Sequence, residues 1–315
     1  MILQRRSAAA LACLLLVAPA WAHDASRPNG HATAGELAVM LVLMLLALAY
    51  ARGVARAWHA VGRSRAVAPR HVVAFGAGWL AVVAALLSPL DALAARSFAA
   101  HMIQHELLMV VAAPLLCLGR PLVAFLWVLS RPRRRQAALL SRRPWTQRLG
   151  ALCLGIGGAW LVHALVLWLW HLPVAFDAAL THEGLHIVQH LAFMASALCF
   201  WWSVLRPASR AAHGRALLSL FTTLLHTGAL GALLAVSALP WYAAYASATA
   251  PLLDPLDDQQ LGGLVMWVPA GSAYVAAGLL LAWRWVGFSA TRRAGTRGLL
   301  SGTAPSRAAG NVATR

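Results

Sequence analysis

Three pairs of histidines are spaced four residues apart in this chain: His101/His105, His182/His186 and His186/His190. Side chains at positions i and i+4 lie on the same face of a helix, and two imidazoles placed in this way can hold one metal ion. Random placement of 13 histidines in 315 residues would give only roughly half of one such pair. The excess indicates metal binding rather than chance.

One pair also fits the H-E-x-x-H motif of zinc proteases, through His182, Glu183 and His186. A protease of that class needs the glutamate beside a metal-bound water and a third ligand from elsewhere in the fold. The other two pairs lack the glutamate, and His182 and His190 would be about 12 Å apart along a helix that rises about 1.5 Å per residue. Metal binding without hydrolysis accounts for all three pairs. We therefore predict that the protein is not an enzyme and that His182 lies outside the site.

The composition places these histidines in a membrane protein. Of the 315 residues 61% are hydrophobic and only 11% are charged, whereas a soluble protein carries about 25% charged residues. Apolar runs of about 20 residues, the length that spans a bilayer, recur along the chain. The sequence thus predicts an all-α fold, a polytopic transmembrane helix bundle. Its seven spans are expected at roughly 35–51, 71–89, 101–119, 149–170, 183–204, 215–238 and 262–284.

The two ends of the chain differ from this membrane domain. Arg5 and Arg6 precede a short apolar run that ends at Ala20-Trp21-Ala22, a pattern typical of a cleaved export signal. We therefore expect a signal segment at 1–22, a seven-span membrane domain at 23–290 and a disordered cytoplasmic tail at 291–315.

Arginine is distributed unequally between the predicted loops. All 26 basic residues are arginine, and the net charge is +17. The loops after spans 1, 3, 5 and 7 hold 21 arginines, whereas only Arg27 and Arg96 fall on the other side. Basic loops of membrane proteins face the cytoplasm, which explains the charge without a nucleic-acid partner. The chain is expected in the bacterial inner membrane, with its N-terminus in the periplasm and its C-terminus in the cytoplasm.

The histidine pairs fall at the periplasmic ends of this layout. His101 and His105 begin span 3, His186 and His190 lie near the start of span 5, and His171 closes span 4 at the same level. Ionisable groups inside a membrane are costly and point to a function. We predict that the two pairs converge on one metal ion, with His171 as an accessory ligand.

Copper is the metal that the surrounding residues favour. Met102 and Met109 lie close to the first pair, and their thioether sulfurs suit Cu(I). A b-type haem is an alternative, because haem takes one axial histidine from each of two helices. A copper transporter is another alternative, in which His163, His226 and the membrane cysteines would form a path.

Four segments of the chain resemble a known family. They are "HMIQHELLMVVAAPLLCLGRP" (101–121), "WHLPVAFDAAL" (170–180), "LHIVQHLAFMASALCFWW" (185–202) and "DQQLGGLVMWVPAG" (258–271). Together they resemble the caa3-type cytochrome c oxidase assembly factor family, which consists of polytopic bacterial membrane proteins. The resemblance extends over roughly residues 35–290.

The resemblance implies a role in maturing a haem–copper oxidase by copper delivery, with oxidase subunits as partners within the lipid bilayer. It leaves open whether the chain forms a homodimer. The histidine positions of the family correspond to the five histidines named above, and two further positions correspond to Asp258 and Met266. We expect Asp258 and Met266 to attract or relay the ion.

Overall fold

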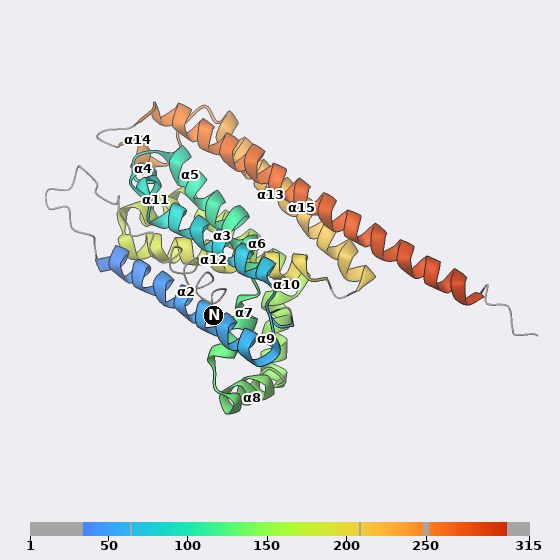
Figure 1. The fold of residues 1–315 in the computed structure, drawn as a ribbon. Coiled ribbons are helices and arrows are strands. Elements are labelled where there is room, and N and C mark those ends of the chain that lie inside the picture. The colour runs from blue at the N-terminus through green and yellow to red at the C-terminus, as the bar shows by residue number, and fades with distance from the viewer. Residues whose placement is uncertain (1–33, 64, 208, 248–251, 301–315) are drawn as a thin grey trace, which may run out of the picture.

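The computed structural model describes residues 34–63, 65–207, 209–247 and 252–300. The predicted signal segment at 1–22 lies outside these residues. Within them the chain forms helices and no strand (Figure 1). The predicted all-α helix bundle is therefore confirmed.

Six stretches of helix are long and apolar enough to cross a membrane. They are Leu37–Val61 within α2 (Ala34–Val61), α3 (Pro69–Leu86), Phe98–Leu118, α12 (Glu183–Leu205), α13 (Arg210–Val236) and Pro255–Val286 within α15 (Pro255–Leu300). A seventh span results if α9 (Pro144–Leu154) and α10 (Ile156–Trp170) count as one. The chain is thus a multi-pass membrane protein, with six or seven candidate spans in the part that the structure describes.

The fourth predicted span is broken rather than continuous. The axes of α9 and α10 differ by 59°, and the break lies at Gly155, whose backbone is extended. Gly157 and Gly158 follow within the first turn of α10. Glycine has about 1 kcal/mol lower helix propensity than alanine, so a cluster of three weakens the helix at this point.

The span Phe98–Leu118 contains three helical segments in series. These are α5 (Phe98–Glu106), the π-helix η1 (Leu107–Ala112) and α6 (Ala113–Leu118). The wider π turn comes just before Pro114, which has no amide proton for an α-helical hydrogen bond. The α conformation is disfavoured in the residue before a proline, so the span ends before Pro121. Arg120 leaves the helix in a left-handed conformation with φ of 53°.

Five shorter helices connect the spans, and proline occupies the first turn of four of them. Proline is favoured there because the first amides of a helix have no intrahelical partner. The five are α4 (Pro89–Ala94), α7 (Pro121–Val128), α8 (Arg131–Leu140), α11 (Pro173–Thr181) and α14 (Ala243–Ala246).

The long helices α13 and α15 run side by side through the bundle (Figure 1). They approach closely because Gly231 faces Gly263: a Cβ atom on Gly231 would lie 2.7 Å from the carbonyl oxygen of Gly263. Helix α15 continues to Leu300. Residues 291–300, the first part of the tail expected to be disordered, thus continue the helix, and the rest of that tail lies outside the described residues.

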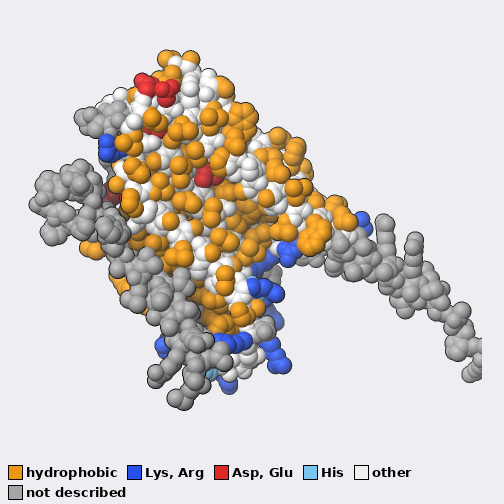
Figure 2. Space-filling view, turned by 45° about the horizontal axis from the view of Figure 1, so that its top comes forward, with side chains coloured by type: hydrophobic (Ala, Val, Ile, Leu, Met, Phe, Trp, Pro, Cys, Tyr) orange, Lys and Arg blue, Asp and Glu red, His pale blue; other side chains and the backbone are white. Residues whose placement is uncertain are grey.

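Charge divides the molecule into two ends (Figure 2). One end carries α4, α11, α14 and the first turn of α15, and we call it the acidic end. The acidic residues of this end are Glu183 at the start of α12, Asp254 directly before α15, and Asp91, Asp177, Asp257 and Asp258 within these segments. The opposite end carries α7, α8 and the start of α9, and we call it the basic end because arginines gather there. A hydrophobic band separates the two ends, as a bilayer requires.

Candidate metal site

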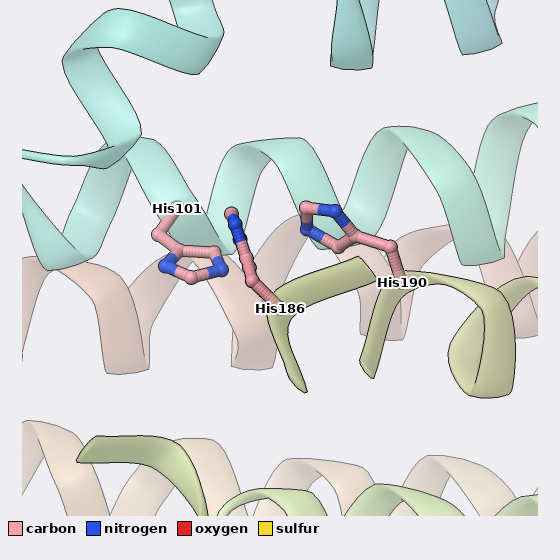
Figure 3. Close-up of side chains that lie close together, drawn as sticks. All are labelled: His101, His186 and His190. Carbon is pink, nitrogen blue, oxygen red and sulfur yellow. The ribbon is translucent and has the colours of Figure 1, made fainter. Parts of the chain in front are cut away.

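Three of the predicted ligands, His101, His186 and His190, form a compact group (Figure 3). His101 comes from α5, and His186 and His190 come from successive turns of α12. One ring nitrogen of each lies within 4.8 Å of a ring nitrogen of the other two. The structure thus brings His101 next to His186 and His190, which follow it by 85 and 89 positions in the chain.

The remaining two histidines extend this group on one side. The ring centroid of His105 lies 4.3 Å from that of His101 and 5.2 Å from that of His190. His171, directly after α10, lies 6.3 Å from His105. All five imidazoles are therefore neighbours, and we call these five residues the histidine cluster. His105 lies next to the three-histidine group, and His171 lies on the far side of His105.

A hydrogen bond fixes the tautomer of His101. The Tyr245 hydroxyl donates its proton to the Ala94 carbonyl at 2.6 Å, and burial, with Asp258 nearby, holds the pKa of this phenol well above its ordinary value. The hydroxyl can therefore only accept from Nδ1 of His101, which lies 2.8 Å away. Nδ1 must carry the ring proton, so Nε2 of His101 has a free lone pair. Metal-bound histidines are oriented in this manner by a partner on the other nitrogen.

His171 is held in the same tautomer by a different partner. Its Nδ1 lies 2.7 Å from the Leu167 carbonyl, and a carbonyl can only accept, so Nδ1 carries the proton. Burial lowers the pKa of His171 to about 4, against the opposing effect of this hydrogen bond. The ring is therefore neutral at pH 7, with a lone pair on Nε2.

Every imidazole of the histidine cluster has a buried nitrogen without a hydrogen-bond partner. These atoms are Nε2 of His101, His171, His186 and His190 and both ring nitrogens of His105. An unpaired buried polar group costs about 1–3 kcal/mol, and several of them in one place are unusual in a folded protein. A bound ion would coordinate these lone pairs and remove that cost.

Asp258 positions α5 instead of joining the histidine cluster. Its carboxylate accepts hydrogen bonds from the Ser97 hydroxyl at 2.7 Å and from the amides of Phe98 and Ala99 at 2.6 and 3.1 Å. These amides belong to the first turn of a helix and need an external acceptor. Asp258 thus holds the N-terminus of α5, one turn before His101. It is not part of the group of close ligand atoms found in the described residues.

Met266 is packed in the apolar core. Its side chain is buried on α15 within the main hydrophobic cluster, which also contains Met102 and Met109. The fold accounts for Met266 as a core residue, and its predicted role in attracting or relaying the ion stays a prediction.

Several residues of the site carried no signal in the sequence. Tyr245 sets the tautomer of His101 from the short helix α14. Phe176 and Phe193 pack against the imidazoles, with ring centroids 5.2 Å from His101 and 4.6 Å from His105, respectively. Tyr245 and Phe176 lie on helices that carry no histidine pair, whereas Phe193 follows His190 by three residues on α12, a spacing that places both on one helix face.

The other histidines lie elsewhere. His182 is exposed at the start of α12 and is not among the close ligand atoms, and Glu183 is likewise exposed. His163 is buried deeper in the bundle, where its Nδ1 contacts the Ser196 hydroxyl at 3.1 Å. His226 lies on α13, where Trp168 donates to its Nδ1 at 3.4 Å.

Residues 48–287 match the sequence model of the cytochrome c oxidase caa3 assembly factor family. The chain belongs to this family. The match extends from α2 to the far part of α15 and includes every residue of the histidine cluster. No curated protein and no solved structure matches the chain. The family is one of oxidase assembly factors, in agreement with the resemblance of the four sequence segments.

Proposed function

We propose that this assembly factor binds a copper ion at the histidine cluster and delivers it to a subunit of a haem–copper oxidase. The observation that carries the proposal is the convergence of His101, His186 and His190, with ring nitrogens within 4.8 Å of one another. The protein would act by holding and releasing copper, without catalytic turnover.

The donor set suits a single transition-metal ion. Metal–imidazole bonds of about 2.0–2.1 Å place two ligand nitrogens about 3.3–4 Å apart, so small side-chain rotations would close the observed spacing. His105 borders the group and would supply a fourth imidazole. Met266 and Asp258 would act at a distance, Asp258 by holding α5 in position.

The same geometry favours an ion over haem. The imidazoles of the cluster are separated by centroid distances of 4.3–6.3 Å, and Phe176 and Phe193 pack against their outer sides. A haem bound between two of these imidazoles would require the rings to move apart. A Soret band in the purified protein would support the haem alternative instead.

The site would face the periplasm. The positive-inside rule assigns the basic end to the cytoplasm of a bacterial inner membrane, so the acidic end and the histidine cluster would lie on the outer side. The acidic side chains would also raise the local concentration of cations near the site.

Copper content tests the proposal. The protein would be purified in detergent, incubated with Cu(I), desalted and analysed by mass spectrometry of the metal. We expect about one copper per chain, because three or four imidazoles complete the coordination of one ion, and none for the His101→Ala, His186→Ala double variant.

The matched control is the His59→Ala, His182→Ala double variant, because both side chains are exposed and lie outside the cluster. It should retain the copper of the wild type. Equal copper in all three proteins would refute the site.

A further inference from the structure

The basic end contains a cavity of about 500 Å³ between α2, α7 and α8. Its residues include four arginines and one tryptophan, and we call it the arginine pocket. The five side chains are those of Arg56, Trp127, Arg131, Arg133 and Arg134. The volume lies within the range of small-molecule sites, about 300–1,000 Å³.

The positive charge of the arginine pocket has no acidic counterpart nearby in the sequence. The chain has no aspartate or glutamate between Glu36 and Asp91 or between Glu106 and Asp177. Helices α2, α7 and α8 lie within these intervals, apart from the first turn of α2. No acidic residue of these helices neutralises the four guanidinium groups, so the cavity is suited to an anion from outside the chain.

Two of the arginines are held in place by the protein. Arg56 donates a hydrogen bond to the carbonyl of Val128, at the end of α7. The guanidinium of Arg134 lies 4.0 Å from the centroid of the Trp127 ring, and its Nη1 is buried without a hydrogen-bond partner. A guanidinium that is stacked and has a free donor is well arranged to bind a phosphate oxygen.

The surroundings of the pocket identify the source of the anion. On α7 the side chains of Leu122 and Leu126 are 52% and 40% exposed, and on α8 those of Leu139 and Leu140 are 57% and 53% exposed. These leucines lie on the same two helices as the pocket, and exposed apolar side chains beside basic ones are typical of the boundary between acyl chains and headgroups. Tryptophan is also enriched at this boundary.

We propose that the arginine pocket binds the phosphodiester headgroup of an anionic phospholipid from the leaflet at the basic end. The guanidinium groups would hold the phosphate, and the exposed leucines of α7 and α8 would contact the acyl chains. Basic pockets beside membrane helices are suited to such headgroups. The lipid would hold α8 against the membrane surface, and its binding would not depend on a metal.

Native mass spectrometry of the detergent-purified chain tests this site. The protein would be titrated with dioleoylphosphatidylglycerol, with dioleoylphosphatidylcholine as the neutral lipid. The Arg131→Gln, Arg133→Gln double variant removes two pocket charges and leaves the arginines that pack against the protein in place. The matched control is Arg142→Gln with Arg143→Gln, which removes two exposed charges from the same end outside the pocket.

We expect the wild type to retain one phosphatidylglycerol at concentrations where phosphatidylcholine does not bind. The loss of two charge contacts should weaken the phosphatidylglycerol affinity about 30-fold in the pocket variant. The control should stay within about threefold of the wild type, since its charges act only through the screened field of the surface.

Three results would overturn the proposal. They are an equal loss in the two variants, equal binding of the neutral lipid, or displacement of the lipid by inorganic phosphate at the same concentration, which would identify a site for the free ion. The Arg131→Lys, Arg133→Lys variant covers the case in which the glutamine variant does not fold. It keeps both charges and should bind within a few fold of the wild type, and a complete loss would contradict an electrostatic site.

Discussion

Replacement of Tyr245 by phenylalanine removes one oxygen atom that orients a proposed copper ligand. The hydroxyl accepts from Nδ1 of His101 at 2.8 Å and donates to the Ala94 carbonyl at 2.6 Å. Without it, the His101 ring can carry its proton on Nε2, the nitrogen that would bind copper. Loss of such an orienting partner typically weakens metal binding 10–100-fold, which corresponds to about 1.4–2.8 kcal/mol.

The assay is a competition titration of Cu(I) between the detergent-purified protein and a chromophoric chelator. Tyr242→Phe is the matched control, because this neighbouring phenol is also buried and donates to a backbone carbonyl, that of His171, at 3.1 Å. Each variant leaves a buried carbonyl unsatisfied, and each should lower the free energy of unfolding by about 1–3 kcal/mol. Only Tyr245→Phe should lose most of its copper affinity. Equal affinities in the two folded variants would refute the tautomer argument.

Three further variants test contacts between helices and the role of the outermost histidine. Asp258→Asn should lower the free energy of unfolding by about 2 kcal/mol, because it weakens charge-assisted hydrogen bonds to the start of α5; thermal unfolding measures this, and the exposed Asp257→Asn should have little effect. Gly231→Val should destabilise by at least about 1–3 kcal/mol, because a Cβ there meets the backbone of α15; Gly278→Ala, where a Cβ meets nothing within 4 Å, is its control in the same unfolding assay. His171→Ala should weaken Cu(I) binding by no more than about tenfold, since this imidazole is outside the three-histidine group, and a complete loss in the competition titration would make it a primary ligand.

The parts of the fold that local patterns determine were predictable. Apolar runs of membrane length located the spans, and the i, i+4 spacing put His101 with His105 and His186 with His190 on single faces of their helices. Charge also divided the chain correctly into a basic and an acidic end. Each of these properties depends on residues that are close in sequence, so a single sequence contains enough information to predict them.

The contacts between helices were not predictable in the same way. The bond from Tyr245 to His101 joins residues 144 positions apart, and the bond from Asp258 to Ser97 joins residues 161 positions apart. No periodicity relates such partners, so Asp258 was expected near the ion, whereas the structure uses it as a cap for α5. The bend at Gly155 was also not predicted, because glycine alone does not distinguish a bend from a close helix contact.

X-ray absorption at the copper K-edge of the loaded protein tests the central claim most directly. The account predicts a shell of three or four imidazole nitrogens at about 2.0 Å, which is lost in the His101→Ala, His186→Ala variant. A shell dominated by sulfur at about 2.3 Å, or the same nitrogen shell in that variant, would contradict it.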